Sequence, residues 1–375
     1  MIGAGGMANS VHYPSLASFS DVQIAAICDL DPGRLNATAD KYGVRARYSD
    51  YREMVDEIAP DAVYAIGQPH IMYDIWMWCL ERGLNLYIEK PMGLTIHQAR
   101  SLAHMAEKKG CVTQVSFQRR TCPMVVMLRD ECLKRGPITH AVCTFYKCST
   151  EPTLGARDHM MDDGVHAIDT LRWMCGGEVV GVESVCRRVL VPDINFITAM
   201  LHFDNGATGV MMNSWTSGRR IFRVEIHAPG VCAEAEHEGK GYLYADGDTK
   251  GVEFDTRQIA GSDDVRVFGG FEAKNREFID CAKSGSQPGS NFSDAVKTME
   301  VAETILAQAL LEGVCRGEGS TTAPRAAPPG ACSGSRRACV LAGRERRSRG
   351  ACARDRHRDL RHVGQALEPR SDRAR

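Results

Sequence analysis

The sequence has almost no net charge and no long apolar run. Its 46 basic and 47 acidic side chains leave a formal charge of −1, which gives no reason to expect a nucleic acid or a membrane surface as partner. No stretch approaches the roughly 18 apolar residues that a membrane span needs. A glycine-rich motif begins at residue 3, which leaves no room for a signal peptide, and we expect a cytoplasmic protein.

The sequence also lacks any C-x-x-C pair, although it contains 15 cysteines. Closely spaced cysteine pairs are typical of structural zinc sites, so no metal site is expected. Several cysteines, such as Cys79 and Cys111, lie within apolar runs. Reduced thiols buried in a core explain them best.

Residues 316–375 lack isoleucine, methionine and the aromatic residues Phe, Tyr and Trp. They contain 15 arginines and six acidic residues, a balance of +9, whereas residues 1–315 carry a balance of −10. A segment so poor in apolar side chains cannot offset the entropy lost when it orders. We interpret 316–375 as a disordered or frame-shifted tail; a basic tail that binds an acidic partner is the alternative.

The remaining chain has a globular composition and is long enough for two domains. Residues 1–120 alternate short apolar runs with helical patterns, which predicts an α/β domain with a parallel sheet. Strands are expected at 23–28, 62–66, 84–88 and 112–117. The helices between them begin at clear capping residues, namely Asp31 before Pro32, Asp50 and Thr95.

Strand patterns predominate after residue 138 and predict a second domain over residues 121–315. One helix is expected at 160–175, and two more at 271–283 and 293–312. The strands are expected at 138–147, 180–190, 196–203, 207–213 and 221–228. Short strands joined by turns such as Asp204-Asn205-Gly206 predict an α+β domain with a mainly antiparallel, open-faced sheet.

Residues 3–8 (GAGGMA) fit the G-x-G-x-x-[G/A] fingerprint of a dinucleotide-binding turn. Gly3 permits the tight turn, Gly5 lets the backbone approach a pyrophosphate, and Ala8 permits close packing of helix on strand. Asp29 ends the next predicted strand about 20 residues further on, as the fingerprint requires. Its carboxylate would accept hydrogen bonds from ribose hydroxyls and repel a 2′-phosphate, which predicts NAD(H) rather than NADP.

Only Met1 and Ile2 precede the first glycine of this motif. The first strand of a Rossmann domain is buried on both faces and supplies about five residues before its glycine turn. We therefore expect either a truncated first strand or a mis-assigned start.

Three later stretches carry residues suited to chemistry: YIEKP (87–91), FQRR (117–120) and DDGVHAID (162–169). Lys90 follows a predicted parallel strand, and ligands bind at the carboxyl ends of such strands. Asp162, His166 and Asp169 are spaced four and three residues apart, so a helix would place them on one face.

Together these motifs resemble the Gfo/Idh/MocA family (glucose–fructose oxidoreductase, inositol dehydrogenase and rhizopine catabolism) over residues 1–312. In that family the lysine of E-K-P and the Asp and His of D-x-x-x-H form the catalytic constellation beside the nicotinamide. Those roles fall here on Lys90, Asp162 and His166. The resemblance implies a sugar, cyclitol or related polyol as substrate. It also implies a homodimer or homotetramer built through the C-terminal sheet.

Two stretches depart from the family pattern and leave the substrate open. Gln68-Pro69 stands where the family often has T-P, and residues 155–159 (GARDH) replace the usual glycine-rich lead into the Asp/His helix. The expected cofactor-binding residues are Gly3, Gly5, Gly6, Met7, Ala8, Asp29, Gln68, Pro69, Glu89, Lys90 and Arg119. Arg157, Asp169 and Trp215 are expected substrate contacts.

The resulting hypothesis is hydride transfer between a carbinol carbon and nicotinamide. His166, whose ordinary pKa is near ~6.5, suits a general base, and Lys90 would stabilise alkoxide charge. Asp162 would orient His166 or bind a neighbouring hydroxyl. Which of Lys90 and His166 takes the proton stays open, as do structural roles for Asp169, Arg119 and Arg120. An NAD-dependent glycosidase and a non-catalytic sugar or nucleotide sensor are the alternatives.

Overall fold

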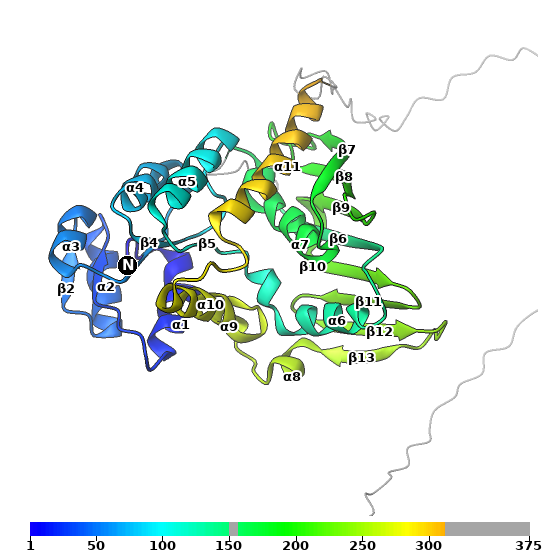
Figure 1. Cartoon of the computed structure of the whole chain (residues 1–375), viewed down its shortest axis with the longest axis horizontal. Helices are drawn as coiled ribbons and strands as arrows, with labels where there is room; N and C mark the ends of the chain where they lie inside the picture. The colour runs from blue at the N-terminus through cyan, green and yellow to red at the C-terminus, as the bar shows by residue number, and fades with distance from the viewer. Residues whose placement is uncertain (150–156, 312–375) are drawn as a thin grey trace, which may run out of the picture. The chain divides into compact units, whose positions relative to one another are not determined.

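The N-terminal region is a parallel sheet covered by helices on both faces (Figure 1). The computed structural model describes residues 1–149 and 157–311, so the predicted tail at 316–375 lies outside the described residues. One part of the sheet pairs β1 (Ala26–Cys28) with β2 (Ala46–Tyr48). The other part contains β3 (Ala62–Ala65), β4 (Asn85–Ile88) and β5 (Thr113–Val115).

Ile2 joins the two parts, since it bridges in parallel to Cys28 on one side and to Ala65 on the other. The N–H of Ile2 donates to the Tyr64 carbonyl at 2.7 Å, and its own carbonyl accepts from Ile66 at 2.9 Å. The resulting order, β2-β1-Ile2-β3-β4-β5, is the order of a Rossmann sheet with its switch point at Ile2. The predicted Rossmann fold is therefore confirmed, with two residues in place of its first strand.

The helices of this region follow their capping residues. They are the π-helix η1 (Ala8–His12), α1 (Tyr13–Ser18), α2 (Pro32–Tyr42), α3 (Tyr51–Ile58), α4 (Pro69–Glu81) and α5 (Ile96–Lys109). The Asp31 carboxylate accepts from the first N–H groups of α2, and the Thr95 hydroxyl accepts from the Gln98 N–H of α5. Gly110 ends α5 in the left-handed conformation that glycine adopts without steric cost.

The C-terminal sheet has eight strands in the order β13-β12-β11-β10-β6-β9-β8-β7. The β6–β9 pair is parallel and the other pairs are antiparallel, which confirms the predicted, mainly antiparallel open sheet. Its strands are β6 (His140–Cys148), β7 (Val179–Arg187), β8 (Phe196–Phe203), β9 (Thr208–Ser214), β10 (Thr216–Ala228), β11 (Val231–Glu236), β12 (Lys240–Ala245) and β13 (Val252–Asp255).

Several elements were not predicted. They are β2, β11, β12, β13, the 3₁₀-helix η2 (Gln118–Thr121), α6 (Pro123–Leu133), α8 (Thr256–Ala260) and α9 (Val265–Phe268). Strand β11 buries Val231, Ala233 and Ala235 on one face, but alanine is a poor strand former. Val231 is the one β-branched residue in β11, too few to mark a strand in a single sequence.

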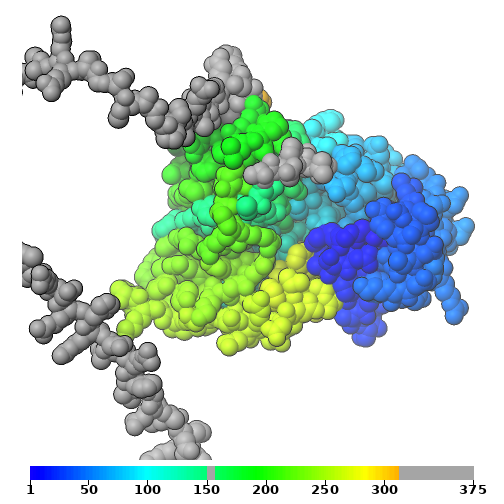
Figure 2. Space-filling model, turned by 180° about the vertical axis from the view of Figure 1, so that it is seen from behind, coloured from blue at the N-terminus to red at the C-terminus, as the bar shows by residue number. Residues whose placement is uncertain are grey.

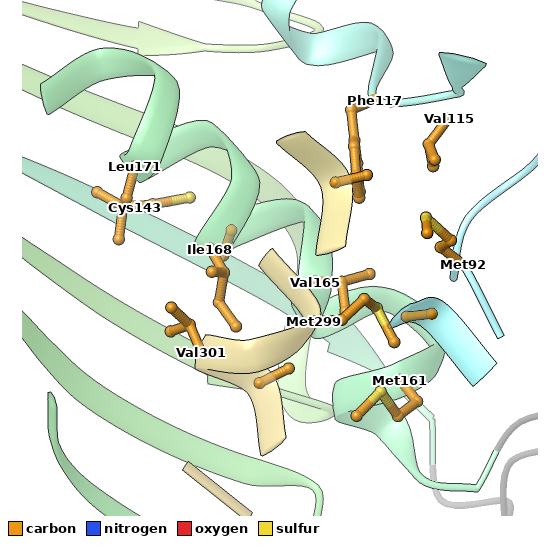
Figure 3. Close-up of a cluster of buried hydrophobic side chains, with 14 of the residues drawn as sticks. Met92, Val115, Phe117, Cys143, Met161, Val165, Ile168, Leu171, Met299 and Val301 are labelled. Carbon is orange, nitrogen blue, oxygen red and sulfur yellow. The ribbon is translucent and has the colours of Figure 1, made fainter. Parts of the chain in front are cut away.

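The helix predicted at 160–175 begins as the π-helix η3 (Met160–Gly164) and continues as α7 (Val165–Cys175). Figure 3 shows Val165, Ile168 and Leu171 of α7 packed among apolar side chains that include Met92 and Met299. These side chains belong to one buried cluster that joins the N-terminal sheet to the C-terminal sheet. Each fully buried side chain of this kind contributes about 1.5–3 kcal/mol, so the segment after β4 and helix α7 are held to a common core.

The last two helices pack against the N-terminal region. Helix α10 (Phe271–Ser284) contacts η1 and α1, and α11 (Phe292–Leu311) contacts α5, α7 and β7. Figure 2 shows α10, in yellow, beside the dark blue N-terminal segment. The chain thus returns to the Rossmann region after its second sheet, and the boundary at residue 120 stays a prediction.

Among residues 1–149 and 157–311, no helix is long and apolar enough to cross a membrane. The same residues contain no group of three or more His, Cys, Asp or Glu side chains placed to hold a metal ion. The cysteines in this part of the chain are unbonded and most are buried.

Candidate functional site

A cleft of about 760 Å³ opens beside the glycine turn, next to the carboxyl ends of β1, β3 and β4. Ligands bind at such strand ends in doubly wound sheets. The cleft is lined by every residue predicted to bind the cofactor or to act in catalysis: Gly3, Gly5, Gly6, Met7, Ala8, Asp29, Gln68, Pro69, Glu89, Lys90, Arg119, Asp162 and His166.

The glycine turn has the shape that a pyrophosphate requires. Gly3 has φ of +97°, and a Cβ there would lie 1.9 Å from the Ile66 carbonyl oxygen, so only glycine fits. A Cβ at Gly5 or Gly6 would meet no atom within 4 Å, so the space in front of the turn is open. Both glycines line the cleft just before η1, where backbone N–H groups lack helical partners. These residues fit a dinucleotide.

Asp29 lies at the end of β1 with its side chain 8% exposed. Its Oδ2 accepts the Ala4 N–H at 2.7 Å, and its Oδ1 accepts the Asp31 N–H at 2.8 Å. Arg34 also reaches Oδ1, at 3.2 Å, from a side chain that is 56% exposed. The carboxylate is therefore fixed against the glycine turn, at the position where ribose hydroxyls are recognised in this fold.

Lys90 extends from the end of β4 toward η3. Its Nζ donates to the Asp162 backbone carbonyl at 2.5 Å and lies 3.4 Å from Asp162 Oδ1 and 3.2 Å from Asp163 Oδ1. Burial by itself would lower the pKa of Lys90, but the carboxylates of Asp163 and Asp162 outweigh burial and raise it. Lys90 is therefore a cation at neutral pH, able to donate but not to accept a proton.

His166 lies in the first turn of α7, and its ring meets the Phe117 ring edge-on at 6.0 Å between centroids. Its Nδ1 is enclosed without a hydrogen-bond partner in the described part of the chain. Burial, and then the positive charges of Arg119 and Lys90, hold the pKa of His166 well below its usual value. The imidazole is therefore neutral at physiological pH.

Glu89 forms a buried pair with His12 behind the cleft wall. Glu89 Oε1 lies 3.0 Å from His12 Nε2, and His12 Nδ1 lies 3.1 Å from Asn275 Oδ1. Because Asn275 Nδ2 donates to the Phe271 carbonyl, its oxygen faces His12, and Nδ1 carries a proton. Glu89 is therefore held by His12, which is held in turn by Asn275 of α10.

The three predicted substrate contacts do not line the cleft. Arg157 pairs with Asp158 and with Glu303 of α11, at 3.1 and 3.0 Å. Asp169 is buried against Arg120, whose Nη2 lies 2.5 Å away. Trp215 is buried and stacks on His159 with ring centroids 4.7 Å apart. Helical spacing did place Asp162 and His166 at the cleft, but Asp169 points toward Arg120.

Other cleft residues were missed by the sequence reasoning. Lys147 of β6 forms an ion pair with Asp163, and Arg220 of β10 pairs with Glu238. Burial would raise the pKa of Asp163, but the positive charges of Lys90 and Lys147 outweigh burial and hold this pKa well below its usual range. Asp163 lies inside the DDGVHAID motif and could have been noticed there, whereas β6 and β10 reach the cleft only through the tertiary fold.

Comparison with known proteins agrees with this geometry. Residues 1–117 match the model of the oxidoreductase family with NAD-binding Rossmann fold (GFO_IDH_MocA), and residues 136–229 match a GFO/IDH/MocA C-terminal domain. The chain is 26% identical to the rhizopine catabolism protein MocA of Rhizobium meliloti, over 81% of this chain and 92% of that protein. It is 24% identical to scyllo-inositol 2-dehydrogenase (NAD(+)) of Bacillus subtilis, over 73% and 83%.

Solved structures share the fold. A dehydrogenase from Chromobacterium violaceum superposes with a TM-score of 0.75 at 19% identity, covering 84% of this chain and 97% of that one. Levoglucosan dehydrogenase in complex with NADH and L-sorbose has a TM-score of 0.72 at 19% identity, covering 83% and 96%. With both domain models matched in order, this chain belongs to the Gfo/Idh/MocA family of oxidoreductases, with an NAD-binding Rossmann domain followed by the family's C-terminal domain.

Proposed function

We propose that the chain interconverts a secondary alcohol and a carbonyl on a sugar, cyclitol or related polyol, with NAD(H) as the redox partner. The observation that carries the proposal is the convergence of Lys90, Asp162 and His166 on the cleft that contains the glycine turn. Lys90 and Asp162 are 72 residues apart, so the fold alone brings them together. The names of relatives, which include inositol and glucoside dehydrogenases, support the substrate class.

The bound nicotinamide would accept a hydride from the alcohol carbon or return one to a carbonyl. Gly3, Gly5 and Gly6 would hold the pyrophosphate, and Asp29 would accept hydrogen bonds from ribose hydroxyls. Met7, Ala8, Gln68, Pro69 and Glu89 would complete that wall of the cleft. We assign the remaining cleft residues to the substrate and its protons.

Lys90 is the electrophilic group. Its ammonium is cationic, and hydrogen bonds to the Asp162 carbonyl and the Asp163 carboxylate fix the position of Nζ. It would donate a hydrogen bond to the reacting oxygen and stabilise the negative charge that develops there. Asp162 positions this lysine rather than His166, because its Oδ1 and its carbonyl both face Nζ.

His166 is the proton acceptor. Lys90 is already protonated, whereas the imidazole is neutral and makes no hydrogen bond within the described residues. It would take the alcohol proton as the hydride leaves and return it in the reverse direction. The proposal thus gives the role of proton acceptor to His166, which the sequence left open between Lys90 and His166.

The test is turnover of a panel of inositols, aldoses and glycosides with NAD⁺, read as NADH absorbance. We expect oxidation of at least one compound by the wild-type protein. Lys90→Ala should lose about 100-fold in rate, equivalent to ~3 kcal/mol of transition-state stabilisation. His166→Ala should lose about 10²–10⁴-fold. The double variant should lose less than the product of the single losses.

Fluorescence titration with NADH is the control, and both variants should bind NADH as the wild type does. If either variant keeps wild-type turnover, that residue does not take part in the proton transfer. If turnover falls only because NADH no longer binds, the residues hold the cofactor or the fold. Release of an aglycone without net NADH formation would instead indicate a glycosidase.

A further inference from the structure

Among the described residues, the part of the cleft that faces the C-terminal sheet is lined by more cations than carboxylates. Lys90, Lys147 and Arg119 line it together with Asp162 and Asp163. Arg220 also lines the cleft but is neutralised by Glu238. Glu89 also lines the cleft and is paired with His12.

Within residues 1–149 and 157–311, Arg119 is the cleft cation that has no carboxylate partner. Lys90 contacts both aspartates, and Lys147 contacts Asp163. Arg119 is only 5% exposed, and its Nε and Nη1 are enclosed with no hydrogen-bond acceptor among the described residues. Burial lowers the pKa of Arg119 to about 10, so it stays positively charged at neutral pH. A buried charge without an acceptor is costly, and proteins keep such groups for a ligand or a partner.

The position of Arg119 points to the substrate rather than to the dinucleotide. Its Cζ lies 4.0 Å from the centre of the Phe222 ring and 5.2 Å from that of Phe145. These rings belong to β10 and β6 of the C-terminal sheet, which also supplies Lys147. The two rings hold the guanidinium plane by cation–π contact and provide no hydrogen-bond acceptor, so its N–H groups remain available.

We infer that the substrate of this enzyme is a polyol or sugar that carries one anionic oxyacid group, a carboxylate or a phosphate ester, and that Arg119 binds this group. A planar guanidinium presents paired N–H donors that match either anion. The negative charge of either group would pair with the Arg119 guanidinium. The inference rests on the proposed function for the alcohol that reacts, and it revises the expected cofactor contact of Arg119 to a substrate contact.

The test compares matched compounds with NAD⁺: D-glucose as the neutral compound, D-glucuronate and D-gluconate as carboxylates, and D-glucose 6-phosphate as the phosphate ester. The wild-type protein should show a kcat/KM at least about 100-fold higher on one acidic compound than on D-glucose. Arg119→Met, which keeps a long side chain between the two rings, should remove that preference mainly by raising KM. Its kcat/KM on D-glucose should fall by a smaller factor than its kcat/KM on the preferred acid, because D-glucose has no anion for Arg119 to bind. Arg119→Lys keeps the charge and should lose less than Arg119→Met.

Arg129→Met is the matched control. Arg129 also lies over an aromatic ring, 4.5 Å from the centre of Trp173, but it does not line the cleft. This variant should keep the acid preference. Thermal unfolding of each variant shows that it folds.

A second readout separates this inference from the proposed function. In the presence of NADH, the preferred acid should raise the unfolding temperature of the wild-type protein, and D-glucose should not. If the acid stabilises the NADH complex through Arg119 but no compound is oxidised, the anion site stands and the proposed function fails. If D-glucose is oxidised as well as the acids, or if Arg119→Met lowers both equally, the function stands and the anion site is overturned. If no compound binds or reacts, both fail.

Discussion

At the scale of single residues, the cofactor preference depends on Asp29 and its neighbour Arg34. The carboxylate accepts hydrogen bonds from Ala4 and Asp31 and pairs with Arg34. This arrangement keeps negative charge at the position where the ribose is recognised in this fold, and it engages Arg34, an arginine that could otherwise receive a 2′-phosphate. The wild-type protein should therefore bind NADH more tightly than NADPH.

Asp29→Ser should reverse part of this preference, because it removes the repelling charge and frees Arg34 for a phosphate. We expect the NADPH affinity to rise relative to NADH by about tenfold, equivalent to ~1.4 kcal/mol. Titration of both reduced cofactors by fluorescence measures it. The double variant Asp29→Ser/Arg34→Ala should lose this gain in NADPH affinity, because it removes the arginine that would bind the 2′-phosphate. Equal binding of both cofactors by the wild-type protein would contradict the assignment.

Two buried histidines should make the protein sensitive to acid. Burial and then Arg119 hold the pKa of His166 well below normal and that of His237 at about 3, whereas each is near ~6.5 in an unfolded chain. Below pH 6.5 the unfolded chain binds protons that the folded protein does not. Stability should therefore fall as pH decreases from 6.5 toward 3, by up to about 1.4 kcal/mol per pH unit for each histidine.

Urea unfolding at a series of pH values measures this slope. His237→Phe is the informative variant, because it removes one of the two groups and places an apolar ring beside Phe222, which the imidazole already meets at 6.0 Å. Its stability should vary less steeply between pH 6.5 and pH 4 than that of the wild type. An unchanged slope would show that His237 is protonated in the folded protein.

At the scale of elements, one buried ion-pair network joins η2, α7 and α11. Arg120 of η2 contacts Asp169 of α7 at 2.5 Å and Asp294 of α11 at 2.7 Å. Arg172 of α7 contacts Asp294 at 3.0 Å. Since His166 lies in the first turn of α7, this network fixes the helix that carries the proposed proton acceptor. Asp169, predicted to touch substrate, has this structural role in the fold.

Arg120→Met should destabilise the protein by about 3–5 kcal/mol, because it leaves the Asp169 carboxylate buried without its partner. The double variant Arg120→Met/Asp169→Leu should recover much of this loss, since it removes both charges. Arg100→Met is the matched control: its pair with Glu300 is exposed and should contribute less than about 1 kcal/mol. Denaturant unfolding checks all three. Equal losses for Arg120→Met and Arg100→Met would contradict the role of the network.

At the scale of the whole molecule, the open sheet presents an apolar face to solvent. Val185, Met200 and Met212 project from β7, β8 and β9, with 53%, 40% and 38% of their surface exposed. Neighbouring strands pair Met200 with Val210 and Thr198 with Met212, so these side chains form one patch. An exposed apolar patch on a flat sheet favours association of two copies.

We predict that the protein is a homodimer or homotetramer and that Met200→Glu/Met212→Glu shifts it to monomers. Sedimentation velocity measures the change. Val252→Glu, at an exposed valine of β13, should leave the assembly unchanged. A monomeric wild-type protein at micromolar concentration would contradict the prediction.

The composition of residues 316–375 also leads to a prediction for the whole chain. A segment without aromatic, Ile or Met side chains adds little apolar surface to a core, so its removal should not change folding. Deletion after residue 315 should shift the unfolding temperature by less than about 2 °C and leave NADH affinity unchanged. A larger loss of stability would show that this segment packs.

The sequence by itself determined the fold class, the glycine turn and the residues beside it. Hydrophobic period and capping chemistry are local, so the strand at 196–203 and the helices that begin at Pro32 and Ile96 follow from neighbouring residues. The same holds for Gly3 and Asp29, which are separated by the glycine turn, the helical segment η1–α1 and strand β1. The Lys90 and His166 roles came from motifs and resemblance, since nothing local places the two side chains together.

Only the tertiary structure decided which charges meet in the cleft. Lys147 lies on β6 and Arg119 on η2, and nothing in the sequence around Lys147 marks it as a cleft residue. Their meeting in the cleft depends on how the eight-stranded sheet lies against the Rossmann region through the shared apolar core. The same packing turns Asp169 toward Arg120, and Asp169 does not line the cleft. Long-range packing and burial set these contacts and pKa values, and no periodicity along the chain encodes them.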